Sequence, residues 1–335
     1  MKFSIKIKAE VSVEKWQELL DNSINVTPFH LQSWMAVSSL THQYKPLYLI
    51  ASYKDGTILA GMPIIERHSL KGILRSYNSL PNGSYGSVIL RQDADPYISK
   101  MLLSHFVKFL NRWNVTNSII VDFNNTNTYL STIGFNTRKA FTHVLDLNQP
   151  IEEIHNRYDY SIRKNIEKAK RNGIIVRDID TLDGIGEYYK ITNAVAKKYN
   201  IEPYPKEFFI NVFKFMVPRS EAKFSLTFRG EQPLSGAMHL ISKGHIFNWL
   251  MPSYPEFLEY RPNEALISHM IDWAFEKKIE IYNFGGSPSD ATGLIKFKEK
   301  WGTKKKEYNI YESGSSSKIV KIIDTVQYFR QKISK

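Results

Sequence analysis

Cysteine is absent from this sequence, and so is any long apolar run. Without cysteine the chain has neither disulfides nor thiolate metal ligands, which is typical of proteins in a reducing cytoplasm. The nine histidines show no spacing typical of a metal site or a nucleophile–base pair. No apolar run is long enough for a membrane span, and the first residues lack a signal-peptide core. We therefore expect a metal-free cytoplasmic protein, at most peripheral to the inner face of the membrane.

The chain is strongly basic, with a formal net charge of +12 and a pI of about 9.4. A basic protein favours anionic partners such as RNA, nucleotides or an anionic membrane surface, and net charge alone does not choose among them. Two basic clusters stand out in the second half of the sequence. The first comprises Arg163, Lys164, Lys168, Lys170 and Arg171, and the second Lys296, Lys298, Lys300, Lys304, Lys305 and Lys306.

The length and the hydrophobic patterning predict two domains of ordinary size. Pro150 precedes a long amphipathic pattern, so we place the boundary there and expect domains at residues 1–150 and 151–335. Helices are predicted over 151–172, before the cap residue Gly173, and over 263–278. The last segment, 318–335, is predicted to form a basic amphipathic helix.

The two halves of the sequence share a pattern. Residues 47–65 and residues 223–241 each read as a strand, a charged turn and a returning strand. Each returning strand contains a pair of small residues, Ala60-Gly61 in the first half and Gly236-Ala237 in the second. A helix and an apolar strand then follow in both halves. The pattern predicts a duplicated domain, and the alternative is two unrelated hairpins.

The most informative stretch lies between Ile281 and Gly302. A short apolar strand ends at Gly285-Gly286, where the backbone can approach a ligand closely, and turn residues follow. In the next apolar run, an extended chain would place Lys296 and Lys298 on one face, toward the space left by the glycines, with Phe297 in the core. A strand that ends in a glycine loop is a common ligand site, and the alternative is an ordinary turn with a solvated lysine face.

Three features together resemble the Fem family of tandem acetyltransferase-fold (GNAT-like) proteins. They are the repeated hairpins, the basic helix over 160–173, and the ending Tyr282–Gly286 followed by Phe297–Gly302. The resemblance implies an α/β (α+β) fold of two GNAT-like domains, each a mixed, mostly antiparallel sheet flanked by helices. It also implies transfer of an aminoacyl or acyl group onto an amino group of a cell-envelope precursor, for peptidoglycan or exopolysaccharide.

The known donors in this family are aminoacyl-tRNAs, so the resemblance implies a tRNA partner and an activated acyl donor as co-substrate, with no tightly bound cofactor. The acceptor would be a small-molecule, lipid-linked or nucleotide-linked amine. Two departures from the family weigh against a nucleotide-linked muropeptide. No basic residue follows Trp34 directly, and the segment Ile201–Pro205 has none. Another amino sugar or an amino acid stays open as acceptor.

Two other readings stay open. The first is an acyl-CoA-dependent GNAT N-acyltransferase acting on an amino sugar or amino acid. Acetyl-CoA enzymes of this fold hold pyrophosphate in an Arg/Gln-x-x-Gly-x-Gly/Ala loop, and the segment here, Glu259–Ala265, has no such pattern. The second is a basic protein that binds RNA or glycan without catalysis.

The resemblance also implies two catalytic residues. Lys298 matches the lysine of the family's Phe-Lys motif, and its charge would stabilise the oxyanion that forms when the amine attacks the donor carbonyl. Lys296 takes that place if the register slips. Asp122 ends the apolar strand of the first half and matches an acid of the bridge-forming relatives, where it would orient or deprotonate the acceptor amine. For Asp122 the alternative is a turn or capping role.

The remaining expected site residues bind substrate. Arg163 and Lys164 suit phosphate groups, and the alternative is a solvated helix face. Gly285 and Gly286 would let a ligand approach the backbone. Arg261 and Asn263 stand at a predicted helix start, which favours an anion, although Asn263 also suits an N-cap. Three aromatic residues are expected as pocket walls or as core: Tyr85, Trp249 and Tyr254.

Overall fold

The computed structural model describes residues 3–80 and 83–314, and the helix predicted over 318–335 lies outside these residues. The chain forms two compact units. Of the described residues, unit 1 contains 3–80, 83–140 and 307–314, and unit 2 contains 141–306. The boundary predicted at Pro150 therefore falls inside unit 2, directly before its first helix.

Unit 1 is built on a mixed sheet with the order β1-β2-β3-β4-β6-β13, and β5 pairs with β3. Only β4 and β6 are parallel; the other neighbours run antiparallel. Its elements are β1 (Ser4–Lys8), α1 (Val13–Asp21), η1 (Pro28–His30), α2 (Gln32–His42), β2 (Lys45–Ser52), β3 (Ile58–Ser69), β4 (Leu74–Ser79), β5 (Ile89–Leu90), α3 (Tyr97–Leu110), β6 (Val115–Asp122), η2 (Thr128–Ile133) and β13 (Lys304–Gly314).

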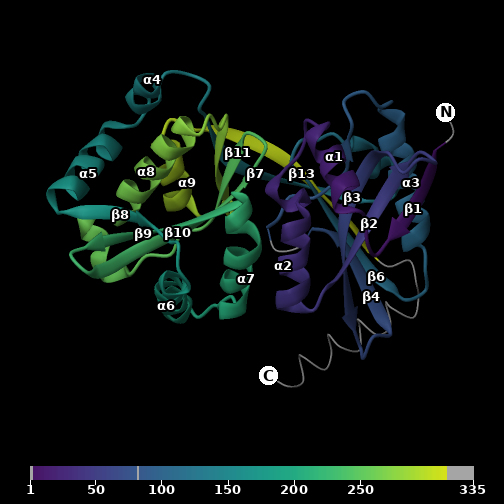
Figure 1. Ribbon diagram of the computed structural model, residues 1–335, viewed down its shortest axis with the longest axis horizontal. Coiled ribbons are helices and arrows are strands. Elements are labelled where there is room, and N and C mark those ends of the chain that lie inside the picture. Colours follow the sequence, from purple (N-terminus) through teal and green to yellow (C-terminus); the bar gives the residue numbers. More distant parts are fainter. Residues whose placement is uncertain (1–2, 81–82, 315–335) are drawn as a thin grey trace. The chain divides into compact units, whose positions relative to one another are not determined.

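Unit 2 repeats this plan with the strand order β7-β12-β11-β10-β9-β8, in which only β11 and β12 are parallel. Helices α5, α8 and α9 cover one face of its sheet, and α6 and α7 cover the other (Figure 1). Its elements are β7 (Asn136–Asp146), α4 (Ile151–Asn156), α5 (Tyr160–Arg171), β8 (Ile174–Asp178), α6 (Leu182–Lys198), α7 (Lys206–Met216), η3 (Val217–Arg219), β9 (Ala222–Arg229), β10 (Gln232–Ser242), β11 (His245–Leu250), η4 (Pro255–Tyr260), α8 (Pro262–Glu276), β12 (Ile281–Gly286) and α9 (Thr292–Glu299).

The glycine of each small-residue pair has the same packing role in both units. A Cβ added to Gly61 would lie 2.6 Å from the ring of Trp16 on α1, and one added to Gly236 would lie 2.6 Å from the ring of Tyr188 on α6. In each unit the glycine lets an aromatic side chain from the first helix after the edge strand pack closely against the sheet. The shared topology and this shared packing confirm the predicted tandem fold.

Each unit receives its last strand from the other half of the sequence. β7 follows β6 along the chain but pairs with β12 in unit 2. β13 follows α9 but pairs with β6 in unit 1. This exchange explains why the compact units do not follow a single cut in the sequence.

Two local predictions were wrong. The helix predicted over 151–172 is two helices, because Asp159 leaves the helical conformation and its carboxylate accepts a hydrogen bond from the backbone N–H of Ser161 (2.8 Å), which caps α5. The segment predicted to be extended around Lys298 is the helix α9. There Phe297 packs against Trp301 one turn later, with ring centroids 6.2 Å apart, as side chains four positions apart do on a helix.

Candidate functional site

The site begins where the parallel pair β11–β12 in unit 2 ends. The two strands pair at only three positions, the last being Phe247 with Asn283. The pairing of β12 with β7 then shifts register between Asn283 and Gly286, which is a bulge. The carbonyl oxygen of the Asn283 side chain accepts hydrogen bonds from the Gly285 N–H (2.9 Å) and the Thr142 hydroxyl (2.7 Å). One buried amide therefore sets the shape of the bulge.

Gly285 is required by this shape. Its φ of +77° lies in the left-handed region, and a Cβ there would stand 3.0 Å from the carbonyl oxygen of Asn248. The bulge interrupts the regular ladder of backbone hydrogen bonds. The carbonyl groups of Gly285 and Gly286 can therefore accept hydrogen bonds from a side chain of α9.

That side chain is Lys298. Its ammonium donates hydrogen bonds to the carbonyl oxygens of Gly285 (2.7 Å) and Gly286 (3.1 Å). The residue is only 6% exposed, and burial lowers the pKa of its ammonium to about 8. The structure thus brings Lys298 and the glycine pair together, as the sequence suggested, through a helix instead of a strand.

Lys296 does not share this position. On a helix, residues two apart point in different directions, so the expectation that both lysines face the glycines was wrong. Lys296 is exposed and lines a separate cavity of about 410 Å³ beside α9, together with Arg157, Asp159, Glu299 and Lys300.

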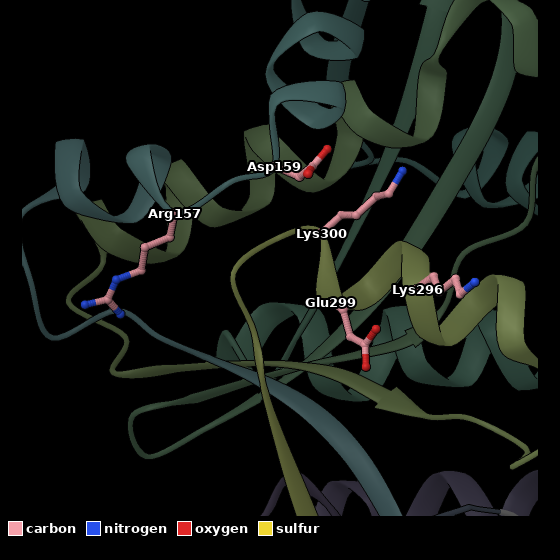
Figure 2. A pocket seen from close by; sticks show the side chains of 5 residues that line it. All are labelled: Arg157, Asp159, Lys296, Glu299 and Lys300. Atoms are coloured by element: carbon pink, nitrogen blue, oxygen red, sulfur yellow. The ribbon is translucent and has the colours of Figure 1, made fainter.

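This cavity is lined by the residues that link α4 to α5 and by the C-terminal end of α9 (Figure 2). Lys300 extends toward Asp159 and donates a hydrogen bond to the Ser161 hydroxyl (3.1 Å). The ends of Arg157 and Lys296 point away from the centre, so the cations stand on the rim of an open cavity. Three cations against two carboxylates, one of which caps α5, give this rim a net positive charge that suits an anion.

His143 on β7 is a site residue that the sequence did not reveal. It is 1% exposed, and neither ring nitrogen has a hydrogen-bond partner within the residues that the structure describes. Its Nε2 lies 4.0 Å from the Glu299 carboxylate. Burial, and then the charge of Lys298, lower the pKa of His143, so it is neutral near pH 7. His143 becomes a candidate because it lies at the bulge, next to Thr142. The bulge forms only in the folded chain, so no sequence pattern could indicate this residue.

Asp122 has a structural role in unit 1. It is 2% exposed at the end of β6, and its carboxylate accepts hydrogen bonds from the Asn127 N–H (2.8 Å) and the Thr126 hydroxyl (3.4 Å). Burial raises the pKa of this carboxyl group. Tyr85, in the same unit, is buried and stacks on Phe123 with ring centroids 4.4 Å apart. Asp122 therefore matches the turn alternative, and Tyr85 matches the core alternative, that the sequence left open.

The other expected residues are spread over unit 2. Arg163 donates to the carbonyl oxygen of Asn156 (3.1 Å), and Lys164 is exposed on α5. Trp249 and Tyr254 are half-buried; their rings lie 5.9 Å from Phe247 and 6.0 Å from Phe257, respectively.

Polar side chains at the start of α8 pair with one another. Arg261 adopts a φ of +64° and lies 3.8 Å from the Glu264 carboxylate. The Asn263 side chain accepts a hydrogen bond from the Ser253 hydroxyl. Pro262 has no N–H to offer. This helix start therefore differs from a phosphate cradle built of backbone N–H groups.

Residues 3–80 and 83–314 contain neither a metal-binding cluster nor a membrane-spanning helix. No cluster of three or more histidine, aspartate or glutamate side chains could hold a metal ion there. No helix in that part of the chain has the length and apolar character needed to cross a membrane.

Comparisons with known proteins place this geometry in a fold. Residues 156–299 match the model of the family described as "Acetyltransferase (GNAT) domain", and no curated protein matches the chain. The structure of FemX is similar over 92% of this chain and 97% of that chain, with a TM-score of 0.73 and 13% identity. L-PGS from Bacillus licheniformis is similar over 93% of this chain and 95% of its own (TM-score 0.58, 14% identity).

A tandem GNAT protein from the clavulanic acid biosynthesis pathway is similar over 93% of this chain and 98% of that chain, with a TM-score of 0.57 and 9% identity. At such identities the similarity speaks for the fold, which is a tandem GNAT fold over nearly the whole chain. The domain match lies in unit 2 and contains Lys298 and the glycine pair. It confirms the predicted class, an acyltransferase.

Proposed function

We propose that this chain is a Fem-like transferase that moves an aminoacyl or acyl group from an activated donor onto an amino group of a cell-envelope or surface-glycan precursor. The observation that carries the proposal is the buried ammonium of Lys298, held against the carbonyl groups of a bulge inside the matched domain. Acyl transfer needs a positive charge where the donor carbonyl develops negative charge, and this group is positioned to supply it.

The chemistry follows from the hydrogen-bond count of an ammonium. Lys298 has three N–H groups, and two of them bond to the carbonyl oxygens of Gly285 and Gly286. We propose that the third bonds to the carbonyl oxygen of the acyl donor when the acceptor amine attacks the carbonyl carbon. The new C–N bond forms, the bond to the leaving oxygen or sulfur breaks, and the proton lost by the amine goes to that leaving group. The glycine carbonyls hold the ammonium in place before the reaction, which lowers the cost of reorganisation.

Two observations favour an aminoacyl-tRNA over acyl-CoA as donor. The start of α8, which would hold pyrophosphate in an acetyl-CoA enzyme, begins with Pro262, which has no N–H to donate, and no glycine loop precedes it. The cavity beside α9 and the exposed cations of α5 also provide a positive surface on unit 2, which suits an RNA backbone. An acyl-CoA-dependent N-acyltransferase is the second candidate, favoured by the GNAT domain match itself.

The proposal is tested by a transfer assay with labelled donors. The purified chain is incubated with a mixture of aminoacyl-tRNAs or with acyl-CoAs, and with amino sugars, nucleotide-linked amino sugars and lipid-linked precursors as acceptors. We expect transfer from an aminoacyl-tRNA, with binding that weakens steeply as salt rises because counterions are released.

Transfer from acyl-CoA, with binding that depends little on salt concentration, would show that acyl-CoA and not aminoacyl-tRNA is the donor. The Lys298→Met variant serves as the inactive reference and Lys277→Met as the control, because Lys277 is an exposed lysine of unit 2 outside the proposed site. Binding of RNA or glycan without transfer from any donor would leave the chain as a binding protein and overturn the proposal.

A further inference from the structure

Two neighbouring loops at one end of the unit 1 sheet present large apolar side chains to solvent. The β3–β4 turn (residues 70–73) carries Leu70 and Ile73, which are 38% and 55% exposed, and the α3–β6 loop (residues 111–114) carries Trp113, which is 60% exposed. The backbone N–H of Arg75 donates to the carbonyl oxygen of Asn114 (2.9 Å), so the two loops lie side by side. We call them the loop pair.

The loop pair is rich in positive charge and contains no acidic residue. Lys71 and Arg112 lie within it, and both are exposed. Directly beside it is a cavity of about 380 Å³, whose lining includes the cations Lys45, Arg75 and Arg112 and the aromatic side chains Tyr77 and Phe109.

The cavity has one acidic residue at its wall, Glu66, which is 4% exposed. Its carboxylate is already engaged by His68 at 2.5 Å, and Arg75 stands 3.9 Å from it. The cations that line the cavity therefore outnumber its acidic residues, which suits an anionic group such as a phosphate.

Unit 2 provides an internal comparison, because it has the same two loops. There the β10–β11 turn is Lys243-Gly244, and the α8–β12 loop is Lys277-Lys278-Ile279-Glu280. Ile279 is 8% exposed, and neither loop presents a large apolar side chain to solvent. The exposed Leu, Ile and Trp of unit 1 are therefore not a requirement of the fold.

We propose that the loop pair docks unit 1 on an anionic lipid surface. Leu70, Ile73 and Trp113 enter the boundary between headgroups and acyl chains, where an indole ring is favoured because one part is apolar and one part is polar. Lys71 and Arg112 lie at the headgroup level and attract anionic lipids. The cavity beside them accepts a headgroup phosphate. Aliphatic side chains gain nothing from a solvated RNA backbone, which is why the lipid surface fits better than RNA.

The test uses the full-length chain and vesicles, with no substrate present, so its result does not depend on the proposed transfer reaction. Flotation with phosphatidylcholine vesicles is compared with flotation on vesicles that also contain phosphatidylglycerol. We expect binding only to the anionic vesicles. Ile73→Ser with Trp113→Ser should weaken it at least tenfold, because burial of large apolar side chains is lost. Lys71→Gln with Arg112→Gln should weaken it roughly fivefold per cation.

Matched controls come from unit 2. Tyr199→Ala removes an aromatic side chain that is 63% exposed, and Lys277→Gln removes a cation from the corresponding loop. Both should bind vesicles as the parent chain does, and unchanged thermal unfolding would show that all variants fold. Equal binding of parent and loop-pair variants would overturn the proposal. Loss of tRNA binding in these variants, with vesicle binding intact, would overturn it in favour of RNA.

Discussion

Units 1 and 2 share a topology but differ at the ends of their strands. In unit 1 the parallel pair β4–β6 is matched at five positions, and β6 ends in Asp122, whose carboxylate closes a turn. In unit 2 the parallel pair β11–β12 is matched at three positions, and β12 ends in the bulge that Lys298 contacts. The duplicated sheet is the scaffold, and the strand ends are where the units have acquired different properties.

The difference separates two tasks. Unit 2 contains the buried ammonium, the neutral His143 and the domain match, so we place the chemistry there. Unit 1 contains the loop pair and its basic cavity, so we place contact with a surface there. Four measurements on variants and on pH dependence test this division.

The largest effect is expected for Lys298→Met, which keeps the length of the side chain and removes its charge. Loss of one oxyanion donor costs roughly 3–4 kcal/mol, or about a hundred- to a thousandfold in turnover. If the charge acts at the transition state, kcat falls and KM changes little. The measurement is steady-state kinetics with Lys277→Met as control. A rise in KM at unchanged kcat would instead assign Lys298 to substrate binding.

The next largest effect concerns the two hairpins. Gly61→Ala and Gly236→Ala should each destabilise the chain by about 1–3 kcal/mol, because the new methyl group overlaps an aromatic ring. Gly186→Ala on α6 is the control, since a Cβ there has no neighbour within 4 Å. Denaturant unfolding measures all three. Two glycines with very different costs would mean that the hairpins are less equivalent than their topology suggests.

The pH dependence of turnover follows from the pKa of Lys298, which burial lowers to about 8. The ammonium form is present below that pH and is lost as the pH rises through it, so turnover should fall about tenfold per pH unit above pH 8. An exposed lysine would keep its proton to about pH 10.4. The check is the pH profile of kcat, with the stability of the protein followed over the same range. A profile that is flat from pH 7 to about 9.5 would contradict a role for this ammonium.

The smallest effect is expected for Asp122→Asn in unit 1. An amide oxygen can still accept the hydrogen bond from the Asn127 N–H, so we expect a loss of stability of about 1 kcal/mol and a turnover within about twofold of the parent. Thermal unfolding and the transfer assay measure the two quantities. A collapse of turnover in a folded Asp122→Asn variant would bring unit 1 into the chemistry and end the division proposed here.

Much of each unit could be predicted from local patterns. The hairpins were predictable because runs rich in apolar residues flank Asp55-Gly56 and Gly230-Glu231, which are turn sequences. Helix α9 was missed because Ile295 and Phe297 alternate with lysines, which mimics a strand over so short a segment. The break between α4 and α5 was missed because the apolar spacing continues through it, and only the capping carboxylate of Asp159 shows where the second helix starts.

The duplication, the positive charge and the glycine pair could be recognised from composition, local periodicity and motif, and the family resemblance pointed to Lys298 as a candidate. The exchange of β7 and β13 between the units is visible only in the folded chain, since strand pairing over long separations leaves no local pattern. The same holds for the burial of Lys298 on two carbonyl groups with His143 nearby. The pKa of a side chain depends on its desolvation and its neighbours, and both exist only after the chain has folded.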